Sequence, residues 1–380
     1  MSGKNNLSKT IRAIGSAISL LLLMALFSCR PSVRVASSDT VGDTLRLRYA
    51  RNLQMIQYDG YMEAIVRNPW DTTHILRRYI LLQGGECPKD FAREATLVTT
   101  PLRRAAVFTS VHCALLEELG CTDAIGGICE LQYIHLPFVH RGVANGTIAD
   151  LGNGMNPNVE RIMQLQPDAL LPTPFENSGG YGRMERIGIP IVECADYMEP
   201  SPLARAEWIR FYGRLFGRNA EADSLFQTIE QRYRSLCHQA ETADHRPRMI
   251  CEIPQSGYWY LPGGQSTMGQ LYRDAGADYL FSDLPGAGST SLSVERVLDR
   301  ALTAEVWLMK HSGLLTREQV FRDYPALRHI PAQTWFCNIA ENNYYEETPF
   351  HPERLLANIV HILHPELELE DVPTYFVPME

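Results

Sequence analysis

The sequence predicts an α/β fold with two doubly wound parallel-sheet lobes, joined by a long rigid helix and preceded by a small N-terminal β extension. Residues 158–162 (NVERI) and 293–297 (SVERV) nearly repeat each other about 135 residues apart, a spacing typical of two related lobes. Each begins with a polar N-cap and a first-turn glutamate and leads to an apolar run suited to a buried strand. Between the repeats, residues 203–239 have helical periodicity.

The individual elements follow from turn signals and apolar periodicity. Alternation or apolar runs predict strands at 45–49, 62–66, 75–82, 104–109, 125–128, 169–171, 189–192, 248–253, 306–309 and 334–336. Periodic segments predict helices at 114–119, 159–165, 220–239, 268–275 and 352–364. The expected organisation is a signal peptide with Cys29 (1–29), a tether (30–44), a β extension (45–100), an N-terminal lobe (101–200), an interlobe helical region (201–242) and a C-terminal lobe (243–380).

The N-terminus predicts export and a lipid anchor. Lys4, Lys9 and Arg12 precede an apolar stretch, 13–27, that is too short for an ordinary membrane span. The stretch runs into LFSC, which resembles the lipobox of bacterial lipoproteins and makes Cys29 the lipid attachment residue. The alternative is a plain signal peptide or signal anchor with an incidental cysteine. We therefore expect a membrane-anchored lipoprotein in the periplasm.

Composition narrows the class of protein. The apolar fraction is 45%, charged residues make up 21%, and the net charge is −9 without any Lys/Arg run, which argues against a nucleic-acid partner. Eight cysteines besides Cys29 form no C-x-x-C pair, so a zinc knuckle or a thioredoxin-type site is not supported. Several lie in apolar runs, which favours buried free thiols over disulfides.

The order of several motifs resembles the solute-binding proteins of ABC importers in the siderophore, haem and vitamin B12 group. The resemblance covers most of residues 100–370 and depends on the order and spacing of segments 107–112, 115–120, 158–162, 165–168, 260–264, 274–278 and 292–298. It implies two α/β lobes joined by one rigid helix. It also implies a receptor without catalytic activity or a cofactor of its own, which works with an ABC permease dimer.

The resemblance assigns one glutamate in each lobe to permease docking. Glu160 and Glu295 match the family's pair of surface glutamates, which contact arginines of the permease. Two separated like charges suit a two-fold partner, because they guide encounter and register. The helix dipole alone would also favour a glutamate at either position, by about 0.3–1 kcal/mol.

The ligand is expected where the loops after the strands of the two lobes converge, as in open α/β sheets. Aromatic residues are frequent in these loops and suit a large planar ligand. The candidate ligand contacts are Ser110, His112, Tyr133, Phe175, Glu176, Tyr197, Tyr258, Trp259, Tyr260, His311 and Tyr344.

Three functions are compatible with these residues. The first is capture of a metal complex, a ferric siderophore, haem or cobalamin. Because few arginines besides Arg183 and Arg141 lie in the predicted loops, haem, a corrinoid or a near-neutral chelate is favoured over a strongly anionic siderophore. The second is direct binding of a transition metal by His112, His311 and a carboxylate such as Glu176. The third is a chelatase-like enzyme that pairs His112 with Glu176.

Overall fold

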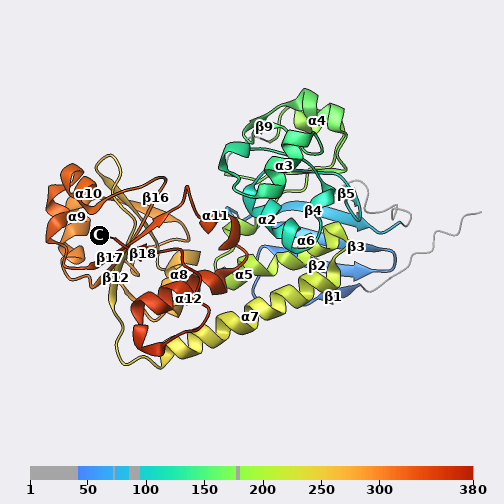
Figure 1. Ribbon diagram of the computed structural model, residues 1–380. Helices are drawn as coiled ribbons and strands as arrows, with labels where there is room; N and C mark the ends of the chain where they lie inside the picture. Colours follow the sequence, from blue (N-terminus) through green and yellow to red (C-terminus); the bar gives the residue numbers. More distant parts are fainter. Residues whose placement is uncertain (1–41, 72, 85–94, 177–179, 380) are drawn as a thin grey trace, which may run out of the picture. The chain divides into compact units, whose positions relative to one another are not determined.

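Two separate parallel sheets organise the protein, whose structure is a computed structural model that describes residues 42–71, 73–84, 95–176 and 180–379 (Figure 1). The first sheet has the strand order β11-β6-β7-β8 and is parallel throughout. Its strands are β6 (Ala105–Val107), β7 (Ile125–Ile128), β8 (Ala149–Asp150) and β11 (Ala169–Leu171). All residues of β6, β7 and β11 are buried, as expected of parallel strands covered on both faces.

The second sheet has the order β14-β12-β16-β17-β18, and all of its pairs are parallel except the one to β18 at the edge. Its strands are β12 (Arg248–Cys251), β14 (Asp278–Tyr279), β16 (Val306–His311), β17 (Gln333–Asn338) and β18 (Val377–Pro378). We refer to the parts of the chain built on the two sheets as the first and the second lobe.

Helices connect the strands within each lobe. In the first lobe they are α2 (Ser110–Glu118), η1 (Thr122–Ala124), η2 (Leu131–Tyr133), α3 (Pro137–Asn145), α4 (Val159–Leu165), η3 (Met184–Ile187) and η4 (Asp196–Met198). In the second they are α8 (Thr267–Asp274), α9 (Val294–Ala301), α10 (Arg317–Asp323), η5 (Pro325–His329), α11 (Tyr344–Glu347), α12 (Pro352–Leu363) and η6 (Pro365–Leu367). Short antiparallel pairs add β9 (Gly152–Asn153) with β10 (Asn156–Pro157), and β13 (Tyr258–Pro262) with β15 (Ser289–Ser293).

Three consecutive helices join the lobes: α5 (Pro202–Glu207), α6 (Ile209–Phe216) and α7 (Asn219–Glu241). The longest, α7, has 23 residues and spans about 35 Å. It packs against α6 and against α12 of the second lobe, which lie along the same side of α7 (Figure 1). Its buried residues, among them Phe226, Ile229 and Tyr233, recur at helical spacing, so one apolar stripe contacts both neighbours. The helix predicted at 220–239 is confirmed.

The N-terminal extension is a five-stranded sheet with the order β1-β2-β3-β4-β5. Its strands are β1 (Asp43–Leu45), β2 (Leu53–Tyr58), β3 (Tyr61–Arg67), β4 (Ile75–Leu82) and β5 (Thr96–Thr99). The first four pair antiparallel, and β5 runs parallel to β4. Tyr79 of β4 is fully buried and its hydroxyl accepts a hydrogen bond from the Glu193 backbone N–H at 2.8 Å, which fixes the extension to the first lobe.

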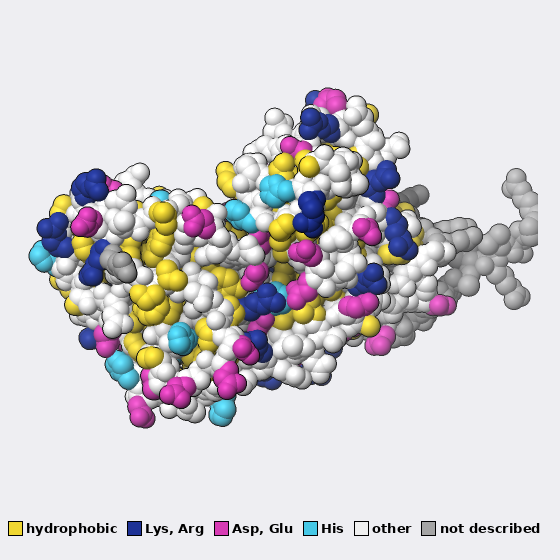
Figure 2. All heavy atoms as spheres, viewed as in Figure 1, with side chains coloured by type: hydrophobic (Ala, Val, Ile, Leu, Met, Phe, Trp, Pro, Cys, Tyr) yellow, Lys and Arg dark blue, Asp and Glu magenta, His cyan; other side chains and the backbone are white. Residues whose placement is uncertain are grey.

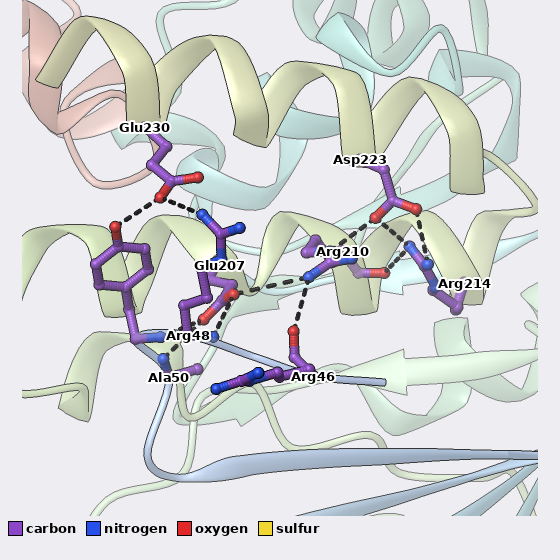
Figure 3. A network of polar contacts seen from close by, with 9 residues as sticks. Arg46, Arg48, Ala50, Glu207, Arg210, Arg214, Asp223 and Glu230 are labelled. Carbon is purple, nitrogen blue, oxygen red and sulfur yellow. Dashed lines mark hydrogen bonds and ion pairs between the residues drawn. The ribbon is translucent and has the colours of Figure 1, made fainter. Parts of the chain in front are cut away.

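The strand predicted at 45–49 is wrong beyond Leu45. The chain leaves the sheet there, because its backbone donors find a carboxylate instead of a neighbouring strand. Glu207 of α5 is fully buried and accepts the backbone N–H groups of Arg48, Tyr49 and Ala50 at 2.8–2.9 Å (Figure 3). The alternation of apolar and charged residues in this segment therefore reflects a docked loop.

The carboxylate of Glu207 belongs to a larger polar network between the docked loop and the helices α6 and α7 (Figure 3). Arg48 and the Tyr49 hydroxyl both donate to Glu230 of α7, at 3.0 and 2.7 Å. Arg210 and Arg214 of α6 both donate to Asp223 of α7, at distances of 2.7–2.9 Å. The network thus attaches the start of the described chain to the interlobe helices.

The strand predicted at 189–192 is also wrong. Only Ile191 pairs with the sheet, through an isolated bridge to Leu170. Gly188 adopts a left-handed conformation and Pro190 lacks a backbone N–H, so the segment cannot form a regular ladder. It passes the edge of the sheet as a half-buried loop.

The described cysteines carry free thiols, and most of them are buried: Cys113, Cys121, Cys129, Cys194, Cys251 and Cys337, with Cys237 half-buried. Cys29 and Cys87 lie outside the described residues. Burial raises the pKa of Cys129 and of Cys251 to about 12, which suppresses the reactive thiolate. These cysteines act as small apolar core residues.

Side chains of α2 and α12 form an ion-pair cluster where the two lobes meet. His351, which precedes α12, is buried and contacts Glu118 of α2 and Glu353 of α12. Arg354 lies 3.8 Å from Glu118 and 3.4 Å from Glu347 of α11. In Figure 2, charged side chains of both signs gather near the middle of the face, over α11 and the start of α12.

The predicted fold class is confirmed: two parallel-sheet lobes, a long connecting helix and an N-terminal β extension. The β extension is more elaborate than predicted, because β1, β2 and β5 complete a sheet of five strands.

Replacing Glu207 should destabilise the fold. Glu207→Leu leaves three backbone N–H groups of the docked loop without their acceptor, and we expect the free energy of unfolding to fall by about 3–5 kcal/mol. Urea unfolding followed by circular dichroism measures the change. Glu221→Leu, at an exposed position of α7, is the matched control and should change stability by less than about 1 kcal/mol. Equal stability of both variants would contradict the role of Glu207.

The interlobe cluster should make stability depend on pH. Burial alone would lower the pKa of His351, but the hydrogen bonds to Glu118 and Glu353 raise it to about 9. A raised histidine pKa contributes stability that is complete below about pH 6.5 and is lost as the pH rises through about 9. His351→Gln should therefore cost about 2–3 kcal/mol at pH 7 and almost nothing at pH 10.

Chemical denaturation at both pH values checks this expectation. His361→Gln, an exposed histidine of the same helix, serves as the control and should follow the wild-type profile. A His351→Gln penalty that stays constant from pH 7 to pH 10 would show that His351 acts through packing alone.

Candidate functional site

The loops that follow the strands of the first lobe surround a cavity of about 480 Å³. Phe108 and Thr109 follow β6, Glu130 comes shortly after β7, and Pro172 and Thr173 follow β11. Because the strands are parallel, their carboxyl ends meet at one edge of the sheet, the usual place for a ligand in open α/β folds. This hollow, the first-lobe cavity, is our candidate binding site.

The far wall of the first-lobe cavity is largely apolar. Met155 lies in the turn between β9 and β10, Phe175 in the loop after β11, and Tyr181 and Met184 in the segment around η3. Met155 is 70% exposed and Phe175 is 42% exposed, values that are high for large apolar side chains. Exposed apolar groups around a hollow are typical of a ligand site.

Two charged residues of opposite sign line the first-lobe cavity: Glu130 and Arg183. Glu130 adopts a left-handed conformation (φ 60°), which turns the chain sharply after β7. Its carboxylate accepts the Gly154 backbone N–H and the Gln132 amide, both at 2.7 Å. Glu130 therefore fixes the β9–β10 turn and with it the position of Met155.

Arg183 is the one basic side chain among the described residues that line the first-lobe cavity. Its guanidinium donates to the Glu160 carboxylate at 2.8 Å, and both side chains are largely exposed. A hydrogen bond from the backbone N–H of Glu160 itself and the pairing with Arg183 lower the pKa of Glu160. The predicted docking residue is thus tied to a residue of the cavity wall.

The second lobe has a corresponding hollow of about 640 Å³. It lies at the carboxyl ends of β12 and β16 and is lined by Ile253, Pro254, Gln255, His311, Leu315, Val320, Asp323 and Tyr324. His311, a predicted ligand residue, is half-buried in this wall, and its Nδ1 donates to the Gly313 carbonyl at 3.2 Å. Each lobe therefore presents a hollow at the expected edge of its sheet.

His112 lies in the interior and lines neither of the two hollows. Its Nδ1 is 2.9 Å from the Thr109 hydroxyl, and its Nε2 is 3.0 Å from Asp196 and 2.8 Å from the Tyr212 hydroxyl. Burial alone would raise the pKa of Asp196, but His112 and Arg205 lower it to about 2. The ring of His112 thus connects α2 to α6, and the neighbouring Ser110 is the half-buried first residue of α2.

The other predicted contacts of the first lobe lie around the loop after β11. Phe175 lines the first-lobe cavity and Glu176 follows it, exposed. Tyr197 is half-buried and its hydroxyl donates to the Pro174 carbonyl at 2.6 Å, so it positions this loop. Tyr133 of η2 is exposed to solvent.

The predicted aromatic contacts of the second lobe fall into an exposed and a buried group, which in β13 follow the alternation of the strand. Tyr258 and Tyr260 of β13 are about half exposed, whereas Trp259 between them is fully buried and donates to the Cys251 carbonyl at 3.0 Å. Successive residues of a strand point to opposite faces, so only the two tyrosines reach the surface. Tyr344 is also buried, with the Lys310 ammonium 5.2 Å from its ring centre, and its neighbour Tyr345 is exposed.

The two predicted docking glutamates have the same local structure. Asn158 caps α4 and Ser293 caps α9, and each side chain accepts the backbone N–H three residues on. Glu160 and Glu295 therefore occupy the first turns of equivalent helices, and both are exposed. They differ in their surroundings: no described residue forms an ion pair with Glu295, whereas Glu160 pairs with Arg183.

The predicted ligand contacts leave out several residues of the first-lobe cavity: Thr109, Glu130, Met155 and Tyr181. Thr109 ends one predicted strand and Glu130 follows another by two residues, so a consistent use of strand ends would have found both. Met155 carries no such signal, because a two-residue strand pair of glycine, asparagine and proline has no apolar pattern.

Comparisons with known proteins agree with this geometry. The family model described as periplasmic binding protein matches residues 106–334, so the chain belongs to the periplasmic binding protein family.

Two archaeal relatives come from Methanocaldococcus jannaschii. The uncharacterized lipoprotein MJ0878 is 23% identical over 348 residues, which cover 84% of this chain and 82% of the relative. The uncharacterized lipoprotein MJ0872 is 19% identical over 304 residues, which cover 76% of each protein. Both alignments are longer than the range 106–334 that the family model matches.

Solved structures share the fold at low sequence identity. A periplasmic haem-binding protein from Pseudomonas aeruginosa is 15% identical with a TM-score of 0.57, covering 73% of this chain and 98% of that one. The molybdate-binding protein MolA of Haemophilus influenzae is 15% identical with a TM-score of 0.55, covering 73% and 91%. The ligands named for these proteins differ, so the shared fold does not identify the solute.

Proposed function

We propose that this protein is a lipid-anchored receptor of an ABC importer that captures a metal complex and delivers it to the permease dimer. The first-lobe cavity carries the proposal, because it is open at the carboxyl edge of a parallel sheet and has an apolar wall. The family provides the wider context of solute binding for an ABC importer.

The chemistry of the first-lobe cavity supports a large, mostly apolar complex. Phe108, Met155, Phe175 and Met184 supply flat or adaptable contact surface, and Arg183 supplies a single positive charge. A strongly anionic siderophore is normally held by several cations. Haem, a corrinoid or a near-neutral ferric chelate therefore suits this wall better.

Lipid attachment at Cys29 is part of the proposal, although residues 1–41 lie outside the described structure. The apolar stretch 13–27 with the terminal LFSC motif supports it, as do relatives that are named lipoproteins. Several acyl chains would hold the receptor at the membrane, at about 0.8 kcal/mol per buried CH₂ group. Among the described helices, none combines the length and the apolar character that crossing a membrane requires.

Docking on the permease would use Glu160 and Glu295. They are exposed, lie one in each lobe and start equivalent helices. A permease dimer with two related basic sites would match such a pair. Charges at such positions guide encounter and orientation more than they add affinity.

The alternatives, direct metal binding and a chelatase-like enzyme, find less support. Both ring nitrogens of His112 already have partners, so the imidazole has no free position for a metal or a porphyrin proton. Within the part of the chain that the structure describes, no group of three or more His, Cys, Asp or Glu side chains could hold a metal ion.

Binding of metal complexes tests the proposal. The full-length protein in detergent should bind one of three probes, haem, cobalamin or a ferric hydroxamate siderophore, with one-to-one stoichiometry and without turnover. Phe175→Ala should weaken that binding about tenfold, the change expected when a large apolar contact is lost. Absorbance titration measures the binding.

Leu302→Ala removes an exposed apolar side chain elsewhere in the second lobe and is the matched control. It should leave affinity unchanged. Binding of none of the three probes, or equal effects of the two variants, would refute capture in the first-lobe cavity. Insertion of metal into free porphyrin by the protein would support the chelatase-like alternative instead.

Loss of both docking glutamates should separate binding from delivery. Glu160→Ala with Glu295→Ala should not weaken solute binding but should abolish stimulation of the permease ATPase in proteoliposomes. Glu221→Ala with Glu318→Ala also removes two exposed first-turn glutamates, from α7 and α10, and controls for the helix-dipole contribution. The control should stimulate normally; equal loss in both double variants would mean that the docking face lies elsewhere.

A further inference from the structure

We propose that Arg183 is shared between the first-lobe cavity and Glu160, so that an anionic group on a bound solute draws Arg183 away and frees the Glu160 carboxylate to pair with the permease. The inference rests on the proposed function and adds to it a link between the ligand site and the docking surface. It also names the solute class: an apolar body with one anionic group within reach of the cavity rim.

The position of Arg183 provides the first part of the argument. Arg183 directly precedes η3, and its chain neighbours Gly182 and Met184 also line the first-lobe cavity. It is the one basic side chain among the described residues of the cavity wall. Its guanidinium has five N–H donors, of which a single contact to Glu160 uses one. The remaining donors are available to a carboxylate, phosphonate or sulfonate at the cavity rim.

The exposure of the ion pair provides the second part. The Arg183 side chain is 66% exposed and the Glu160 side chain 64% exposed. Such a pair contributes little net free energy, because water solvates both groups well and salt screens them. An anion that is also held by the apolar wall can therefore replace Glu160 as the partner of Arg183.

The asymmetry between the lobes provides the third part. Glu295 has the same cap and the same helical position as Glu160 but, among the described residues, no ion-pair partner. Pairing with arginine is therefore not a general requirement of a first-turn glutamate in this fold. The glutamate that is paired is the one next to a cavity-lining arginine, which points to a specific link to the first-lobe cavity.

Two matched fluorescent probes test the sharing. The anionic probe is 8-anilinonaphthalene-1-sulfonate, and the neutral probe is N-phenyl-1-naphthylamine, which has the same rings without the sulfonate. The wild-type protein should bind the anionic probe about tenfold more tightly, the gain expected from one charge-assisted hydrogen bond. Arg183→Gln should abolish this preference and leave the neutral probe unaffected.

Glu160 competes with the anionic probe for Arg183, so its removal should strengthen binding of this probe. Glu160→Gln frees Arg183 and should tighten the anionic probe about threefold, in line with the small contribution of an exposed pair. In the Arg183→Gln background the same substitution should have no effect. Saturation with the anionic probe should also raise the pKa of Glu160, followed by carboxyl carbon NMR, toward its ordinary value.

Two control variants test whether the change in probe affinity is specific to Arg183. Arg186→Gln, an exposed arginine of η3 that does not line the cavity, should bind both probes like the wild type. Phe175→Ala should weaken both probes alike, since it alters only the apolar wall.

Three results would overturn the inference: equal affinity of the anionic probe for wild type and Arg183→Gln, no gain in Glu160→Gln, or the same gain with and without Arg183. Failure of the proposed function is distinguishable, because it appears as an absence of metal-complex binding while both naphthalene probes behave as expected.

Discussion

The packing of α7 against both α6 and α12 is the interaction on which the rest of the structure depends. A single helix of 23 residues buries one apolar stripe between the two lobes, so the lobes share a common hydrophobic contact and are not linked by loose strands. The carboxylates of Glu207, Asp223 and Glu230 then attach the N-terminal segment to the same group of helices.

The sequence predicted the framework of the fold but not its irregular parts. Strands such as β4 and helices such as α7 have clear apolar patterns and were predicted with nearly the observed bounds. Residues 45–49 alternate like a strand, yet Glu207, about 160 positions away in sequence, accepts the N–H groups of Arg48, Tyr49 and Ala50. No local pattern records such a distant partner.

The candidate site was predictable to the level of loops rather than of side chains. Strand ends indicated the segments around Thr109, Glu130 and Phe175, and these residues line the first-lobe cavity. Which side chains of these segments reach the surface, however, depends on strand alternation and on tertiary contacts. Trp259 and His112 were attractive for their chemistry, but both are buried and hydrogen-bonded, while Arg183 appeared only as a minor charge. A histidine two or three residues into a capped helix is often a core residue, and the structure shows why.

The location of a bound metal tests the central claim most directly. Crystals of the full-length protein grown with an iron or cobalt complex that binds in solution would give an anomalous signal at the metal. The account predicts this signal within the first-lobe cavity, beside Phe175 and near the Arg183 guanidinium. A metal found on the far side of the β9–β10 turn, at the N-terminal sheet or in the helical region around Glu207 would contradict it.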